Sequence, residues 1–163
     1  MLKPIKVATK RAVEGVFAIV ASRYNGRYVD SMLRAARANL NEAGVRAVRI
    51  IRVPGAFEIP LAAECFARKG WLQPPGGQLS AVICLGVILK GETTHANLIG
   101  EAVTRALMQI QLDHAIPVIH EVLLLDNEAQ ARVRCLGKTH NRGTEAAQTA
   151  LAMARVMREL KGT

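Results

Sequence analysis

The sequence is short of aromatic residues, of cysteines and of long hydrophobic runs. Aromatic side chains make up 4% of its 163 residues, whereas hydrophobic residues make up 50%. The core must therefore be aliphatic, and it is large enough for a folded domain. The three cysteines, Cys65, Cys84 and Cys135, are odd in number and widely spaced, which favours neither a disulfide framework nor a metal site. No apolar run reaches the roughly 18 residues of a transmembrane helix, so a membrane protein is not expected.

The composition is basic, with 22 Lys and Arg against 13 Asp and Glu and a formal net charge of +9. Such a balance suits nucleic acid or small anionic substrates. No run of five basic residues occurs and aromatic residues for base stacking are scarce, which disfavours nucleic acid. The basic N-terminus lacks the apolar region of a signal peptide, so we expect a cytoplasmic protein. We also expect one domain over residues 1–163, with residues 1–15 as an N-terminal extension.

Four segments are typical of strands: Val16–Ala21, Val48–Val53, Ala81–Leu89 and Pro117–Leu125. Val48–Val53 alternates between apolar and basic residues, so we expect it to be less deeply buried. Segments with helical periodicity lie between these four, the first expected to begin at Asp30 or Ser31, and two helices follow the last strand. Strands that alternate with helices form parallel sheets through right-handed crossovers. The sequence therefore predicts an α/β fold, a three-layer αβα sandwich with a four-stranded parallel sheet flanked by helices.

The segment Ala81–His95 is the one around which the prediction is organised, because a buried strand ends there in a polar turn. Thr93 or Thr94 can cap the helix that follows. The carboxyl ends of parallel strands are where such sheets bind ligands, and a helix N-terminus favours an anion there. The P-loop and the dinucleotide-binding glycine motif are both absent. From this pattern alone, His95 is either a group that takes part in chemistry or a cap or surface residue.

Polar and aromatic residues also mark other predicted strands. Tyr24 follows the first strand, either as an aromatic at the ligand-binding edge or as a lid over the core. Glu58 lies in the first turn of a helix, where it either accepts hydrogen bonds from a ligand or is a carboxylate favoured by the helix dipole. His120 and Glu121 interrupt the last strand, which indicates a site or a subunit interface, because unpaired polar groups are costly in a core.

Several stretches together resemble the 6,7-dimethyl-8-ribityllumazine synthase family. They are Ser22–Asn25, Val53–Pro60, Gly86–His95 and Lys138–Ala147, and they occur in the family's order between about Val16 and Leu160. The most specific are the Pro-Gly-Ala-Phe-Glu-Ile-Pro stretch and the Gly-x-Thr-x-His turn. The resemblance implies a flavodoxin-like fold. It also implies a transferase without a cofactor that condenses 5-amino-6-(D-ribitylamino)uracil with 3,4-dihydroxy-2-butanone 4-phosphate in riboflavin biosynthesis and releases phosphate.

The resemblance also implies roles for individual residues. His95 is the catalytic residue, which transfers protons during imine formation and phosphate elimination. Tyr24 stacks on the pyrimidine ring, and Glu58 accepts hydrogen bonds from the ribityl hydroxyls. The phosphate is bound by backbone N–H groups at the helix start and by a guanidinium. The remaining substrate-binding residues that the resemblance implies are Ala56, Phe57, Val87, Ile88, Leu89, Glu92, Thr93, His120, Arg134 and Lys138.

The resemblance further implies a homo-pentamer or a multiple of it, with riboflavin synthase as a candidate partner. The sites then lie between subunits, with Tyr24, Glu58 and His95 from one chain and His120 and Arg134 from the next. The chain departs from the family pattern at several positions: Ala96, Asn97, His120, Glu121, the kink Lys138–Arg142 and the proline loop 70–78. The first four favour, as an alternative, a non-catalytic lumazine- or flavin-binding paralogue. The kink and the loop favour an assembly smaller than a shell.

Overall fold

The computed structural model describes residues 15–45, 47–68 and 78–162, so most of the expected N-terminal extension and proline loop lie outside the described residues. Within these residues the strands are β1 (Val16–Ser22), β2 (Ala47–Val53), β3 (Leu79–Leu89) and β4 (Val118–Leu125). The helices are α1 (Gly26–Glu42), α2 (Ile59–Ala67), α3 (His95–His114), α4 (Glu128–Cys135) and α5 (Arg142–Lys161), with a 3-10 turn η1 (Ala56–Glu58) before α2.

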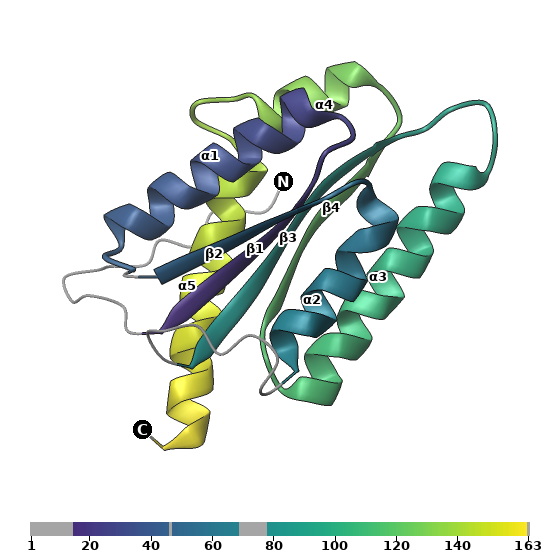
Figure 1. Cartoon of the computed structure of the whole chain (residues 1–163). Coiled ribbons are helices and arrows are strands. Elements are labelled where there is room, and N and C mark those ends of the chain that lie inside the picture. The colour runs from purple at the N-terminus through teal and green to yellow at the C-terminus, as the bar shows by residue number, and fades with distance from the viewer. Residues whose placement is uncertain (1–14, 46, 69–77, 163) are drawn as a thin grey trace.

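All four strands are parallel and lie in the order β2-β1-β3-β4. Helices α1, α4 and α5 cover one face of the sheet, and α2 and α3 cover the other (Figure 1). The predicted three-layer αβα sandwich with a four-stranded parallel sheet is confirmed, and its strand order is flavodoxin-like. Because the chain moves from β1 to β2 on one side and later to β3 on the other, the sheet reverses its order between β1 and β3. Ligands bind at such a reversal in open α/β sheets.

The burial of the strands follows from their apolar runs. Every residue of β1 is buried, with Phe17 and Ile19 facing α1 and α5, and Ala18 and Val20 facing α2 and α3. A strand covered on both faces needs apolar residues at every position rather than at alternate ones. The edge strand β2 is less buried, as its alternating sequence predicts, and Ile51 stays 43% exposed. Among the described residues, no helix has both the length and the apolar character needed to cross a membrane.

Helix α1 begins at Gly26, four residues earlier than Asp30, so the prediction of its start was wrong. Asn25 adopts a left-handed conformation with φ 55° and ψ 38°, and its carbonyl oxygen accepts from Tyr28 N–H and Val29 N–H. Asparagine tolerates this conformation better than most residues, so the chain turns into the helix directly after β1. Tyr28 and Val29 consequently belong to the buried stripe of α1.

Helix α3 buries fewer residues than its sequence predicts. Its apolar residues extend around more than one stripe, and only the stripe facing the sheet is buried: Ala96, Val103, Leu107 and Ile110. The helical periodicity of the sequence predicts Leu98 and Ala102 on the same apolar stripe as Val103, but Leu98 is 62% exposed and Ala102 is exposed as well. Met108 and Leu112 add to the exposed apolar surface of this helix. In α5, Met157 is half-buried rather than buried.

The kink before α5 brings that helix into close contact with α1. Asn141 caps α5 by accepting from Gly143 N–H at 2.9 Å, and its side-chain amide donates to the Cys135 carbonyl at 2.6 Å. A Cβ atom at Gly143 would lie 1.9 Å from the Met32 carbonyl oxygen of α1. Glycine at this position therefore sets the distance between the two helices, and a methyl group would force them apart.

Candidate active site

Hydrogen bonds at the carboxyl edge of the sheet join the loop after β1 to the loop after β2 and to the strand β3. Arg23 N–H donates to the Val53 carbonyl at 2.8 Å, and Tyr24 N–H donates to the Pro54 carbonyl at 3.0 Å. The Asn25 side-chain amide donates to the Val87 carbonyl of β3 at 2.8 Å. These three bonds bridge β1 to its neighbours on both sides. They fix the loops across the point where the strand order reverses.

Tyr24 and Glu58 lie on either side of Gly55. A Cβ atom at Gly55 would lie 2.9 Å from Tyr24 Cδ2 and 3.0 Å from Glu58 Oε2, so a side chain there would displace one of them. Glu58 Oε2 accepts from Gly55 N–H at 2.8 Å, which orients the carboxylate and leaves it capacity to accept further hydrogen bonds. Tyr24 is 71% exposed and Phe57 62% exposed, so Tyr24 is not a lid over the core.

The turn after β3 presents polar groups at the start of α3. Val87 and Ile88 are buried, Leu89 is half-buried, and Glu92, Thr93 and His95 are exposed. His95 is the first residue of α3, and its N–H donates to Thr93 Oγ1 at 3.4 Å. Thr94 holds the N-cap position without a capping bond from its side chain. The positive end of a 20-residue helix is therefore directed at this turn, where it favours an anion beside the His95 imidazole.

Lys90 lies at the same edge but is already paired. Its Nζ lies 2.6 Å from Asp126 Oδ1, and its N–H donates to the Leu125 carbonyl at 2.9 Å. Hydrogen bonds from Lys90 and Gln130 hold the pKa of the Asp126 carboxyl below its usual range. The pair ties the end of β3 to the end of β4 and offsets the lysine charge. An anion bound at this edge must therefore be held by donors other than the Lys90 ammonium group.

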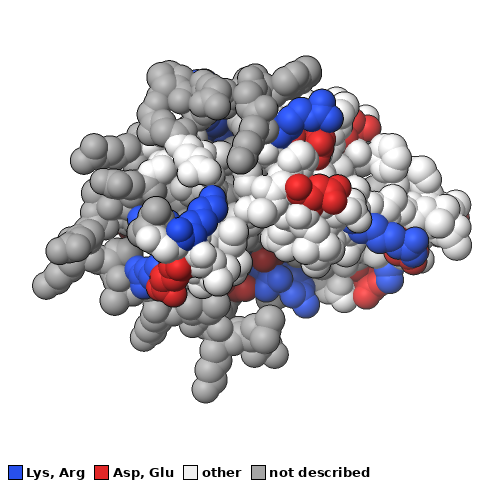
Figure 2. All heavy atoms as spheres, turned by 90° about the horizontal axis from the view of Figure 1, so that it is seen from below, with Lys and Arg blue, Asp and Glu red and all other residues white. Residues whose placement is uncertain are grey.

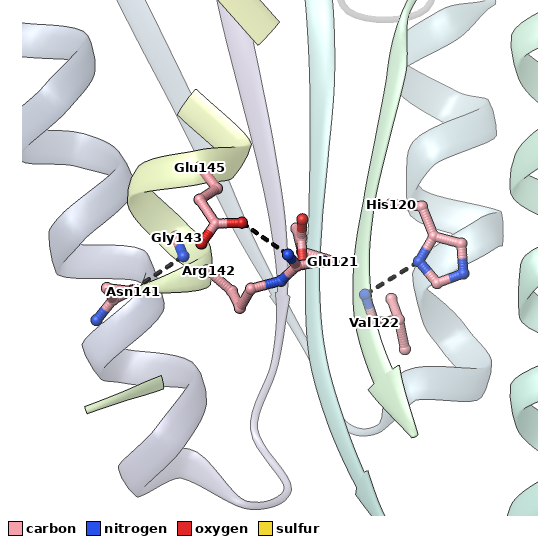
Figure 3. A network of polar contacts seen from close by, with 7 residues as sticks. All are labelled: His120, Glu121, Val122, Asn141, Arg142, Gly143 and Glu145. Carbon is pink, nitrogen blue, oxygen red and sulfur yellow. Dashed lines mark hydrogen bonds and ion pairs between the residues drawn. The ribbon is translucent and has the colours of Figure 1, made fainter. Parts of the chain in front are cut away.

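His120 and Glu121 point to opposite sides of β4 (Figure 3). The His120 side chain faces α3, where its Nε2 lies 2.8 Å from Thr104 Oγ1, and its Nδ1 accepts from Val122 N–H at 3.1 Å. Glu121 faces α5 and is 7% exposed. Burial lowers the pKa of the His120 imidazole, which favours its neutral form.

Glu121 finds its partner within its own chain, which corrects the expectation that a neighbouring subunit supplies it. Arg142 Nε, at the first residue of α5, donates to Glu121 Oε2 at 2.9 Å. Arg142 Nη1 donates to Glu145 Oε2 at 2.6 Å, so one guanidinium serves two carboxylates (Figure 3). The polar interruption of β4 is thus satisfied by the docking of α5 against the sheet. Glu121 alone is therefore no argument for a subunit interface.

The buried Glu121 predicts a pH-dependent stability. Burial, opposed by the attraction of Arg142, raises the pKa of the Glu121 carboxyl from 4.5 to about 7. Between these values the native state holds a proton that the unfolded chain has lost, so the free energy of unfolding falls as the pH rises through this window. The loss should reach about 3 kcal/mol, at 1.36 kcal/mol for each pKa unit. Urea unfolding of wild type and Glu121→Gln at several pH values measures it.

Comparing the free energy of unfolding of wild type with that of Glu121→Gln separates the effect of this carboxyl from the effects of all other ionisable groups. We expect Glu121→Gln to lose the decline of stability between pH 4.5 and 7 that wild type shows. The matched control is Glu145→Gln, which changes the second carboxylate on Arg142 and should keep the decline. The prediction would be contradicted if the free energy of unfolding changed equally with pH in wild type and in Glu121→Gln.

Not all the predicted site residues come together in one chain. The structure brings together Tyr24, Ala56, Phe57, Glu58, Val87, Ile88, Leu89, Glu92, Thr93 and His95 at the carboxyl edge. Arg134 and Lys138 are exposed on α4 and on the kink that follows it, in the layer opposite α3. His120 pairs with Cys84 in the sheet register, well before the end of β3. No hydrogen bond or ion pair within the described ranges joins these three residues to Tyr24, Glu58 or His95.

Sequence reasoning missed several polar residues of this region. They are the bridging Asn25, the Lys90–Asp126 pair, Thr104 and Glu145. A local signal existed for Asn25, because asparagine after a strand is typical of a left-handed turn. Glu145 had a weaker signal as an acid in the first turn of a helix. Nothing local pointed to Thr104, whose partner lies in a strand 16 residues further on.

The charged side chains of the surface are mixed in sign where Figure 2 shows them. On that face, basic and acidic residues of the described part lie side by side rather than in one basic patch. Nucleic-acid surfaces need a continuous basic stripe, which this face does not offer. The positive net charge instead suits small anions.

The fold and the carboxyl-edge loops are those of a flavodoxin-like α/β protein with a candidate site at the reversal point of its sheet. The profile of the 6,7-dimethyl-8-ribityllumazine synthase family matches residues 15–158. Curated proteins called 6,7-dimethyl-8-ribityllumazine synthase are similar over most of their length. The one from Xanthomonas campestris pv. campestris is 37% identical, covering 86% of this chain and 88% of its own. Those from Pyrococcus furiosus and Xanthobacter autotrophicus are 38% and 40% identical, each covering 88% of this chain and 85% of its own.

The chain belongs to the 6,7-dimethyl-8-ribityllumazine synthase family, and it is an enzyme of the transferase class. The resemblance that the four sequence stretches carried is confirmed by both comparisons. Nothing in them favours the non-catalytic alternative.

Proposed function

We propose that this enzyme condenses 5-amino-6-(D-ribitylamino)uracil with 3,4-dihydroxy-2-butanone 4-phosphate to 6,7-dimethyl-8-ribityllumazine, a step of riboflavin biosynthesis. The amine attacks the ketone and loses water to form an imine, phosphate is then eliminated, and the ring closes onto the remaining carbonyl carbon with loss of a second water. The observation that carries the proposal is that hydrogen bonds join the loops of Tyr24 and Glu58 to each other and to Val87 of β3, the strand that leads to His95. Holding both reactants side by side there supplies a large part of the rate.

The heterocycle is proposed to lie against Tyr24, whose exposed ring offers a flat face for stacking. Glu58, oriented by Gly55 N–H, accepts hydrogen bonds from the ribityl hydroxyls. Backbone groups line the rest of the ring and come from two loops: Ala56, Phe57, Val87, Ile88 and Leu89. These assignments follow the family resemblance and are compatible with the exposures and contacts at this edge.

The phosphate is proposed to bind at the start of α3. Backbone N–H groups of Glu92 and Thr93 donate to it, and the helix dipole favours its charge. Arg134 and Lys138 supply positive charge, and Arg134 offers two parallel N–H donors to one anion. His95 transfers protons at this position, because an imidazole has one nitrogen that can donate a proton and one that can accept it.

The complete site is proposed to need two subunits. Arg134 and Lys138 lie in the layer opposite α3, and His120 lies along β4, so one chain alone leaves the groups apart. A ring of five identical contacts brings the carboxyl edge of one chain to α4 and β4 of the next. The exposed apolar residues of α3, Leu98, Met108 and Leu112, are suited to such an interface.

Two experiments test the proposal. Purified protein with both substrates should produce the absorbance of the lumazine product, and binding of the product without turnover would favour the non-catalytic paralogue. Light scattering should give a pentamer or a multiple of it. A fully active monomer would contradict the shared site. A particle of about sixty subunits would contradict only the preference for an assembly smaller than a shell.

The domain organisation, the cellular location, the absence of a cofactor and the partner are also part of the proposal. The chain acts as one domain with residues 1–15 as an extension, in the cytoplasm, and without a cofactor. Its cysteines are unpaired in the described residues, and two of them are buried, which suits a reducing compartment. Riboflavin synthase is the enzyme that would take up the product and is the proposed partner.

A further inference from the structure

The hydrogen bonds of His120 determine which of its nitrogens carries the proton. Thr104 Oγ1 donates its single hydrogen to the Gly100 carbonyl at 2.8 Å, so it can only accept from His120 Nε2, which lies 2.8 Å away. Val122 N–H can only donate, and it does so to His120 Nδ1 at 3.1 Å. Both contacts are satisfied by one form of the ring, the neutral tautomer with hydrogen on Nε2.

A protonated imidazolium does not fit this arrangement. Its second N–H would be directed at Val122 N–H, and the backbone donor would lose its acceptor. Burial of the ring lowers the pKa of His120 and so also favours the neutral form. The side chain in register on β3 is the buried Cys84. On α3, Glu101 and Arg105 flank Thr104 and pair with each other at 3.4 Å, while Glu121 faces the other side of the sheet.

We propose that Thr104 is a positioning residue, which fixes the His120 ring as a flat, uncharged surface for the heterocyclic substrate bound by the adjoining subunit. The inference rests on the proposed function, in which His120 lines the site. A neutral imidazole held by two hydrogen bonds presents such a surface, because it carries no charge and its ring is fixed in orientation. His95 is then left as the histidine that transfers protons.

Nitrogen NMR of the full-length protein reads the tautomer directly, without turnover. Wild type should show a proton on Nε2 of His120 at neutral pH. Thr104→Val keeps the shape of the side chain but removes the hydroxyl, so the ring should exchange between tautomers. Thr104→Ser keeps the hydroxyl and should restore the wild-type spectrum, which a purely steric role of Thr104 would not predict.

Kinetics test the link to the substrate. Thr104→Val should raise KM for the ribitylamino-uracil roughly 3- to 10-fold, the value of one neutral hydrogen bond, with little change in kcat. The same substitution in a His120→Phe background should have no effect, because no imidazole remains to be positioned.

The outcomes separate the inference from the proposed function. A proton on Nδ1 in wild type, or an imidazolium at pH 7, would overturn the positioning role. An unchanged KM in Thr104→Val with a changed tautomer would overturn the contact of His120 with the heterocycle. An inactive wild-type enzyme with the expected NMR signal would overturn the proposed function and still support the positioning of His120 by Thr104.

Discussion

Replacing His95 by alanine should lower kcat by about 10²- to 10⁴-fold, the usual contribution of a general acid–base group. The imidazole is exposed at the first residue of α3, beside the N–H groups proposed to bind phosphate. Its proton transfers occur during imine formation and phosphate elimination, so its loss raises the energy of transition states rather than of bound substrate. Steady-state kinetics with each substrate varied in turn should therefore show a large fall in kcat and little change in either KM.

The control for His95→Ala lies on the same helix. His114 is at the opposite end of α3, where its Nε2 contacts Glu64 Oε2 at 2.9 Å, and His114→Gln preserves a polar partner there. This variant should retain wild-type turnover. An unchanged kcat in His95→Ala, together with weaker substrate binding, would assign the residue a binding role instead.

Replacing Arg134 by alanine should weaken the binding of the phosphorylated substrate far more than the binding of the ribitylamino-uracil. Loss of a charge-assisted contact costs about 1.5–3 kcal/mol, which corresponds to roughly a 10- to 150-fold rise in KM. Arg134 is exposed on α4, so its removal leaves no cavity and the fold should be unaffected. Separate KM values for the two substrates measure the difference.

Neighbouring substitutions show whether the effect belongs to Arg134. Arg132→Ala removes an equally exposed charge from the same helix, one that pairs with Glu128 at 3.3 Å, and should leave both KM values unchanged. Arg134→Lys should recover part of the affinity, because lysine keeps the charge but not the two parallel donors. Equal losses for both substrates in Arg134→Ala would count against a phosphate contact.

The architecture was predictable because burial on both faces leaves a strong signal in the sequence. The apolar runs of β1 and β3 are typical of strands that are covered on both faces, and the structure places both strands at the centre of the sheet. The start of α1 was not predictable from caps, since the left-handed Asn25 begins the helix without a side-chain capping bond. The exposure of Leu98 was missed for another reason: α3 has more apolar residues than one face of a sheet can cover.

The meeting of the Tyr24, Glu58 and His95 loops at the carboxyl edge was predictable, because the loops after parallel strands lie at one edge of the sheet. The partners of His120 and Glu121 were not, since the Glu121–Arg142 contact depends on how α5 docks against β4. A strand pattern shows that a polar residue needs a partner, but it does not show which element supplies it. The expectation that Glu121 needs a partner from outside its own chain was wrong for this reason. The shared site stays a proposal, which is supported by the separation of Arg134 from His95 within one chain.

The dependence of one sheet face on α5 has a consequence for how the chain is made. α5 packs on α1 and against β3 and β4, and it covers the face lined by Phe17, Ile19, Ile83 and Leu85. All four strands are synthesised before this helix, so the part of the apolar face that α5 covers, beside α1 and α4, stays uncovered until α5 has been made. Such intermediates aggregate through their open faces, and contacts between distant segments form slowly. The nascent chain is therefore expected to need chaperone protection most between the synthesis of β4 and that of α5.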